Sequence, residues 1–300
     1  MFIGNWDFGK DENNLKNYQP IIIVGAPRSG TNMLREVICK LPGVGTWPCD
    51  EINFIWRHGN IGAITDAFPA EYARPAVIRY IRKRFDSLAR TSNLDFVVEK
   101  TCANSLRIPF VKNVIPNAKY IFIYRNGIDV VASANLRWTA KLDLGYILEK
   151  ARFVPFTDLP YYFVRFVMNR LYRLFSDQGR LAFWGPQLED MNTLLSKYSL
   201  EQVCAIQWSR CVNSAEAALA KLPEDHVIRV KYEDFVADPQ KEFKNICQAL
   251  EIPATGEEVQ AAVESVSRSS VGKGSAQMDE MQLESLSPML EETLSRLGYR

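Results

Sequence analysis

The sequence has few of the residues that build metal centres or disulfide frameworks. Only two histidines occur in 300 residues, His58 and His226, and the six cysteines include no Cys-x-x-Cys pair. A structural zinc site needs about four cysteine or histidine ligands at close spacing, so this composition argues against one. Scattered single cysteines are typical of reduced thiols in an intracellular protein. We therefore expect no bound metal.

Long apolar runs and an excess of either charge are also missing. No stretch of about 18 apolar residues is present to cross a bilayer. The first twenty residues are polar and lack the apolar core of a signal peptide. The 36 basic and 35 acidic residues give a net charge of +1, which argues against a nucleic-acid partner. These features predict a cytoplasmic protein without a membrane segment, and they leave the oligomeric state open.

The remaining composition is that of an ordinary globular chain, with 47% hydrophobic and 24% charged residues. Short apolar runs alternate with segments of helical periodicity, which predicts an α/β fold with a central parallel β-sheet flanked by helices. We expect one domain over residues 1–300, with an N-terminal extension at 1–19. The four expected strands are residues 21–24, 96–98, 119–124 and 226–231. Helices are expected after Thr31, near Ile52, within residues 69–92, over 200–222, and after Asp238-Pro239.

The first expected strand leads into a glycine-bounded loop, residues 25–30, of sequence Gly-Ala-Pro-Arg-Ser-Gly. A helix then begins at Thr31, because apolar side chains recur at helical spacing from Met33 onward. Strand, loop and helix together place backbone N–H groups and the positive end of a helix dipole at one point. Such a point binds phosphate. A glycine turn that merely leads into a core helix is the alternative interpretation.

A second anion-binding pattern follows the strand at residues 119–124. Arg125 comes directly after the strand, and Ser133 lies two turns along the helix that begins near Gly127. A guanidinium and a hydroxyl placed in this way can bind one phosphate together, the arginine through two N–H groups.

The two patterns resemble those of sulfotransferases that use 3′-phosphoadenosine-5′-phosphosulfate (PAPS). Pro27-Arg28-Ser29-Gly30-Thr31 is similar to their 5′-phosphosulfate loop, with arginine in place of lysine. The sequence Arg-Asn-x-x-Asp-x-x-x-Ser from Arg125 to Ser133 is similar to their 3′-phosphate motif. The resemblance spans residues 21–274 and implies the sulfotransferase variant of the P-loop nucleoside triphosphate hydrolase-like fold. It also implies sulfuryl transfer, with 3′,5′-adenosine bisphosphate (PAP) as the product of the donor and no metal.

The resemblance assigns the donor-binding residues. In the phosphosulfate loop they are Arg28, Ser29, Gly30, Thr31 and Asn32, and Arg125 and Ser133 hold the 3′-phosphate. Tyr232, in a Tyr-Glu-Asp sequence after the last strand, is placed near the adenine, with a packed strand-end aromatic as the alternative. Lys273 and Gly274 are the candidates for a C-terminal loop at 265–277 that closes over the donor. A flexible Ser/Gly linker is the alternative there.

The acceptor hydroxyl needs a base, and the sequence offers several. Asp50-Glu51-Ile52-Asn53-Phe54 looks like a stretch of the heparan 3-O type of sulfotransferase, which places Glu51 at the base position; His58 is second and Asp50 third. From the residues alone, Asp50 and Glu51 serve equally well as caps of a helix near Ile52. Lys100, at the end of the second strand, is expected as a cation near the sulfuryl group, against a strand end that simply reaches solvent. Glu99-Lys100-Thr101 also favours the carbohydrate branch of the family.

The acceptor itself is left open by the sequence. A carbohydrate, lipid or secondary-metabolite hydroxyl and an amine all fit. The aromatic segment 139–200 is expected to be helical and to lie on the acceptor side, and a mobile flap there is a hypothesis. Two alternative functions place other demands on the sequence. A P-loop nucleotide or small-molecule kinase would need the Walker A lysine after Gly30, where Thr31 stands instead, and a non-catalytic binding protein would not depend on Arg28 or Glu51.

Overall fold

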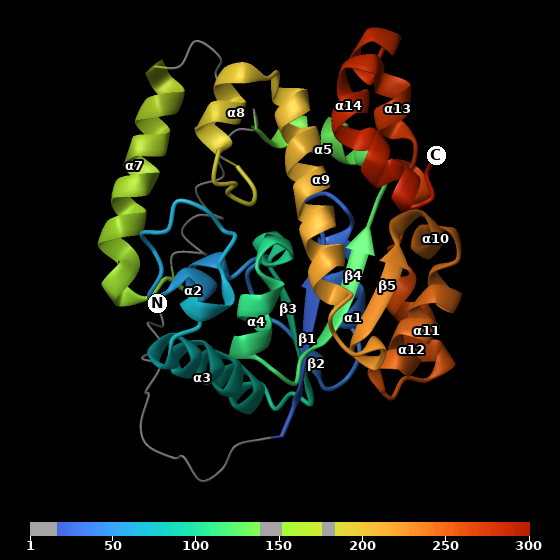
Figure 1. Ribbon diagram of the computed structural model, residues 1–300. Coiled ribbons are helices and arrows are strands. Elements are labelled where there is room, and N and C mark those ends of the chain that lie inside the picture. Colours follow the sequence, from blue (N-terminus) through green and yellow to red (C-terminus); the bar gives the residue numbers. More distant parts are fainter. Residues whose placement is uncertain (1–16, 139–151, 176–183) are drawn as a thin grey trace.

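The computed structural model describes residues 17–138, 152–175 and 184–300. Its centre is a five-stranded sheet of order β2-β3-β1-β4-β5, in which every neighbouring pair is parallel. The strands are β1 (Gln19–Val24), β2 (Val44–Gly45), β3 (Phe96–Lys100), β4 (Lys119–Tyr124) and β5 (Val227–Lys231). The expected parallel α/β sheet is therefore confirmed, and Figure 1 shows it enclosed by helices.

Helices and short 3-10 turns connect the strands on both faces of the sheet (Figure 1). Before β4 they are α1 (Thr31–Ile38), α2 (Asn53–Arg57), η1 (Ala70–Tyr72), α3 (Pro75–Thr91), η2 (Cys102–Leu106) and α4 (Ile108–Val114). Among the described residues between β4 and β5 they are α5 (Gly127–Trp138), η3 (Phe156–Asp158), α7 (Leu159–Phe175), α8 (Met191–Lys197), α9 (Leu200–Leu219) and η4 (Glu224–His226). After β5 they are α10 (Tyr232–Ala237), α11 (Pro239–Leu250), α12 (Gly256–Val263), η5 (Arg268–Ser270), α13 (Lys273–Gln277) and α14 (Glu280–Arg296).

The alternation of side chains along β1 divides the core into two layers. Ile22 and Val24 face a layer that also contains buried residues of α3, α4, α5, α9 and α14. Ile21 and Ile23 face the other layer, with α1, α10, α11 and α12. All four side chains are fully buried. Because successive side chains of a strand point to opposite faces, an unbroken apolar run is what a strand covered on both sides requires.

Most expected elements occur, and the differences have local causes. β2 was not predicted, because the two residues Val44 and Gly45 are too short to show any pattern. The last strand begins at Val227, since His226 belongs to η4. The basic helix runs from Pro75 and buries Val77, Ile81 and Phe85 as expected. The capping interpretation for Asp50 and Glu51 is wrong, because the N-cap residue of α2 is Ile52, without a side-chain cap.

Two segments expected from the sequence are only partly described by the structure. Residues 1–16 of the N-terminal extension, and 139–151 and 176–183 of the aromatic segment, lie outside what the structure describes. Within the described part of that segment, α7 and α8 are helical as expected.

Candidate active site

The glycine-bounded loop joins the end of β1 to the start of α1 at the carboxyl edge of the sheet. Its backbone takes left-handed conformations at Arg28 (φ 72°) and Gly30 (φ 91°). Gly30 is the N-cap of α1 and carries no side chain to satisfy the first N–H groups of that helix. N–H groups at such a helix start are available to an anion. The loop therefore has the geometry of a phosphate cradle, as the sequence predicts.

Three buried polar atoms around this loop have no hydrogen-bond partner among the described residues. They are Ser29 Oγ, Asn32 Oδ1 and Arg125 Nε. Buried polar groups in native proteins are nearly always satisfied, and an unsatisfied one needs an explanation. They are three of ten such atoms in the described part of the chain, and a polar ligand or its water at this loop would supply their missing partners.

Arg28 lies inside the cradle and connects it to α5. Its Nε donates a hydrogen bond to Ser133 Oγ at 2.9 Å. Burial lowers the pKa of the Arg28 guanidinium, and the positive charges of Arg137 and Arg125 lower it further. Clustered guanidinium groups repel one another, so their closeness favours a bound anion at the same place.

Arg125 is 6% exposed and makes contacts with four parts of the chain. Its guanidinium donates to the carbonyl of Arg28 at 3.3 Å, to the carbonyl of Ser270, and to Asp129 Oδ2 at 3.4 Å. It also lies over the ring of Tyr232, 4.5 Å from the centroid, a cation–π geometry. Arg125 thus ties the loop after β1 to α5, α10 and the C-terminal segment.

Tyr232 packs directly against the cradle. A Cβ atom added at Gly30 would lie 2.5 Å from Tyr232 Cδ2, which is too close for any side chain. Glycine at this position is therefore required both by its positive φ and by the neighbouring ring. The structure places Tyr232 beside both predicted phosphate motifs. Whether it contacts adenine stays a prediction.

One carboxylate of α5 bonds the backbone of the C-terminal segment at two places. Asp129 accepts hydrogen bonds from the backbone N–H of Gly272 at 2.8 Å and of Gly274 at 2.6 Å. A Cβ at Gly274 would lie 2.6 Å from Cα of Asp129, so only glycine permits this approach. Lys273, between these two glycines, is exposed. The segment is folded into η5 and α13, so the flexible-linker alternative is wrong, and sequence reasoning gave no role to Asp129.

The second group of predicted residues gathers at the end of β3. Lys100 Nζ donates to Glu51 Oε1 at 2.9 Å, and the backbone N–H of Cys102 donates to the same oxygen at 3.3 Å. Burial lowers the pKa of Lys100, but Glu51 and other nearby acidic groups outweigh it, so the net shift is upward. Lys100 is therefore a fixed cation. Its strand-end alternative, with the side chain simply reaching solvent, is wrong because its side chain is 2% exposed.

The Glu51–Lys100 pair adjoins the cradle. Lys100 stands opposite Ile23 of β1 in the sheet register, and Thr31 Oγ1 lies 3.7 Å from Cys102 Sγ. The Glu51 side chain is 28% exposed, so its carboxylate is reachable from solvent. The structure therefore brings the candidate base and the second cation to the same sheet edge as the phosphate loop.

His58, the second candidate base, has a different partner. Its Nδ1 lies 2.8 Å from Asp158 Oδ2, and its ring is 3.9 Å from that of Tyr80. These contacts place His58 between α2, α3 and η3. Asp50 is partly exposed and contributes to the upward pKa shift of Lys100.

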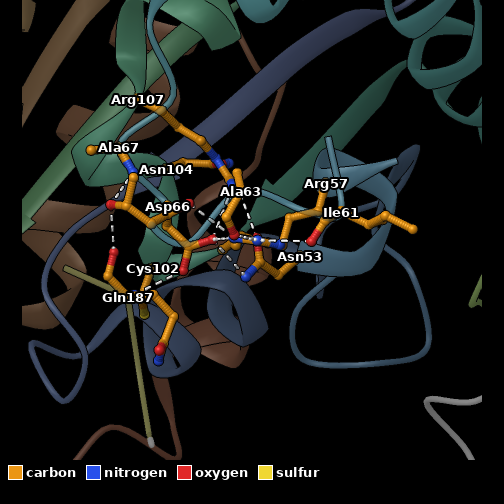
Figure 2. Close-up of polar contacts among 12 residues, drawn as sticks. Asn53, Arg57, Ile61, Ala63, Asp66, Ala67, Cys102, Asn104, Arg107 and Gln187 are labelled. Atoms are coloured by element: carbon orange, nitrogen blue, oxygen red, sulfur yellow. Dashed lines mark hydrogen bonds and ion pairs between the residues drawn. The ribbon is translucent and has the colours of Figure 1, made fainter. Parts of the chain in front are cut away.

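A buried polar network centred on Asp66, which includes Asn53, was not predicted from the sequence. Asp66 accepts from Arg57 Nη1 at 2.6 Å, from Arg107 Nη1 at 3.5 Å and from the backbone N–H of Gln187 at 2.8 Å. Figure 2 shows how Asn53 and Asn104 join the same cluster. Arg57, Asp66 and Arg107 are each less than 5% exposed. Isolated polar residues in unrelated segments carry no spacing signal, so no sequence pattern predicted this network.

The strand, glycine loop and helix, with two arginines beside them, are the arrangement of the P-loop-containing fold class. Residues 19–292 match the family model of the sulfotransferase domain. The chain belongs to the sulfotransferase family.

Solved structures with the same fold include other members. One is a sulfotransferase domain from the curacin biosynthetic pathway, with 15% identity, TM-score 0.53, and coverage of 95% of this chain and 99% of that one. Another is the sulfotransferase domain of the Synechococcus PCC 7002 olefin synthase, with 16% identity, TM-score 0.52, and coverage of 94% and 97%. A sulfotransferase from Alicyclobacillus acidocaldarius has 15% identity, TM-score 0.51, and coverage of 94% and 95%. No curated protein matches the chain by sequence.

The described residue ranges contain no helix of sufficient length and apolar character to span a bilayer. They also contain no group of three or more His, Cys, Asp or Glu side chains arranged to hold a metal ion.

Glu99 gives the site region a pH-dependent stability. Burial raises the pKa of this carboxyl from 4.5 to about 7, although hydrogen bonds and nearby positive charge oppose the rise. The folded state therefore binds the proton more tightly than the unfolded state. The stabilisation is complete below pH 4.5 and is lost as pH rises through 7. We expect the free energy of unfolding to fall by up to about 3 kcal/mol over this range from Glu99 alone.

Urea denaturation from pH 4.5 to 8 measures this effect. Glu99→Gln has no titrating group, so its stability should fall less with pH than that of the wild type. Parallel curves for the two proteins would contradict the assignment.

Proposed function

We propose that the protein transfers a sulfuryl group from PAPS to an acceptor hydroxyl. The observation that carries the proposal is the joining of two phosphate motifs about a hundred residues apart, through Arg28 Nε and Ser133 Oγ. Membership of the family supports the reaction class. The missing Walker A lysine argues against nucleoside triphosphate hydrolysis.

The residues present fit the donor. The N–H groups at the start of α1, including that of Asn32, suit its 5′-phosphate together with Ser29, and the unsatisfied hydroxyl of Ser29 supports this assignment. Arg125 and Ser133 suit the 3′-phosphate. Asp129 holds the backbone of Gly272 and Gly274 against α5, and this would keep the C-terminal segment closed over that phosphate.

The donor supplies a sulfuryl group already activated by its bond to phosphate. In the transfer, the acceptor oxygen forms a bond to sulfur while the bond from sulfur to the phosphate oxygen breaks. Arg28 would stabilise the charge that grows on the departing phosphate, and Lys100 the charge on the sulfuryl oxygens. Glu51 would accept the hydroxyl proton as general base. Its contacts with Lys100 and Cys102 fix the position of one carboxylate oxygen.

The class of acceptor is inferred from the proposed base alone. We favour a hydroxyl on a carbohydrate, a lipid or a secondary metabolite, because a carboxylate rather than a histidine is the proposed base. A cytoplasmic location stays part of this proposal.

Replacing Arg125 tests the assignment of the 3′-phosphate. We expect Arg125→Ala to weaken PAP binding by about tenfold or more, since a hydrogen bond to a charged group contributes about 1.5–3 kcal/mol. Binding of adenosine 5′-phosphosulfate, which lacks the 3′-phosphate, should change by less than about threefold. Isothermal titration calorimetry measures both. Arg229→Ala, at an exposed arginine of β5, is the control, and equal losses for both ligands would contradict the assignment.

Replacing Glu51 tests the base. Glu51→Gln should lower the rate of PAP release from bound PAPS by about 10²-fold or more, because general base catalysis contributes that much. Affinity for PAP should stay nearly unchanged, since the base acts in the transition state. Single-turnover assays with water, and with octyl glucoside as a hydroxyl acceptor, measure the rate. Glu36→Gln, at an exposed glutamate of α1, is the control. An unchanged rate would move the role to His58 or Asp50.

A further inference from the structure

We propose that a closed ring of buried hydrogen bonds positions the base Glu51, with Thr101 and Glu99 as its positioning residues. The inference rests on the proposed function, because it assigns a role to residues behind the proposed base. Glu99 and Thr101 touch neither the phosphate loop nor the Glu51 carboxylate in any contact described above, yet both are fully buried at the sheet edge.

The ring begins at the backbone one residue after Glu51. The N–H of Ile52 donates to Thr101 Oγ1 at 3.2 Å, and the hydroxyl of Thr101 donates to Glu99 Oε1 at 2.5 Å. The other carboxyl oxygen, Glu99 Oε2, accepts from Asn104 Nδ2 at 2.8 Å. One hydroxyl and one carboxyl thus connect the loop of Glu51 to η2.

The ring returns to the loop through a buried arginine. Arg107 Nε donates to Asn104 Oδ1 at 2.9 Å, and Arg107 Nη2 donates to Asn53 Oδ1 at 2.6 Å. Asn53 is bonded to Ile52 by the peptide chain, so the ring is complete. Figure 2 shows Asn53, Asn104 and Arg107 within one cluster of polar contacts. The hydrogen bonds of the ring hold the backbone at residues 52 and 53 from two sides, through the N–H of Ile52 and the side chain of Asn53.

The alternation of side chains along β3 explains why the ring and the Glu51–Lys100 pair do not share the same space. Along β3, Val97 faces one layer of the core and Val98 the other. By the same alternation Glu99 and Thr101 share one side and Lys100 has the opposite side. Lys100 therefore holds the Glu51 carboxylate directly, while Glu99 and Thr101 hold the backbone that carries it. The two kinds of contact together determine where the carboxylate oxygen lies.

Misplacement of a catalytic group by about 1 Å can lower the rate about 10²-fold. Loss of the ring should therefore lower the rate of transfer measurably. Thr101→Val keeps the shape of the side chain and removes both hydrogen bonds of the hydroxyl. We expect it to lower the single-turnover rate of PAP release about tenfold, with PAP affinity within about twofold of the wild type. Thr101→Ser retains the hydroxyl and should recover most of the rate.

A double-mutant cycle separates positioning from a loss of stability. If Thr101 acts through Glu51, Thr101→Val should have almost no further effect on the rate of the Glu51→Gln variant. Thr293→Val is the matched control, because Thr293 is an equally buried threonine whose hydroxyl bonds Ser209 and Asn213, on α9. It should leave the rate unchanged. Amide hydrogen exchange at Ile52 should become faster in Thr101→Val and stay unchanged in Thr293→Val.

The outcomes distinguish this inference from the proposed function. Equal rate losses from Thr101→Val in the wild-type and Glu51→Gln backgrounds would overturn the positioning role, and so would an unchanged rate in the wild-type background. Neither result affects the donor site if PAP still binds. A wild-type protein that fails to bind PAP would instead overturn the proposed function, whatever the Thr101 variants show.

Discussion

The site depends on positive charge held at one edge of the sheet. Arg125 lies close enough to Arg28 for its positive charge to lower the pKa of the Arg28 guanidinium. Arg125 is buried and Arg28 is partly buried. Like charges in such surroundings are unfavourable unless something compensates them. Inside the protein, backbone carbonyls and Asp129 supply part of the compensation for Arg125. Ser29 Oγ and Arg125 Nε are donors without a partner among the described residues, and the proposed anionic ligand would supply the rest.

The buried network around Asp66 has a different purpose from the charges at the phosphate loop. Removing charged groups from water costs free energy that their mutual attraction does not always offset. Arg57, Arg107, Asp66 and Glu99 nevertheless lie together with almost no exposure. Such networks are weak evidence for stability and better evidence for a fixed conformation. Here the fixed conformation is that of residues 52 and 53, directly after the proposed base.

Much of the fold could be predicted from the sequence, because its signals are local. The unbroken apolar run of β1 predicts a strand covered on both faces, and the glycines at 25 and 30 predict the loop. That Arg28, Arg125 and Ser133 lie together could also be predicted, since the two motifs each follow a strand at fixed spacing; their role in donor binding stays a prediction. The residues missed have partners far along the chain. Asp129 bonds residues 143 and 145 positions away, and Thr101 bonds Ile52. Such pairings depend on the tertiary fold, and no spacing along the chain reports them.

The central claim is that the site binds a 3′-phosphorylated adenosine nucleotide. Calorimetric titration of the wild-type protein with PAP, beside a titration with ATP and magnesium, tests this claim most directly. The account predicts clear binding of PAP without added metal and no comparable binding of ATP. Binding of ATP with magnesium in preference to PAP would contradict it and would favour a P-loop kinase.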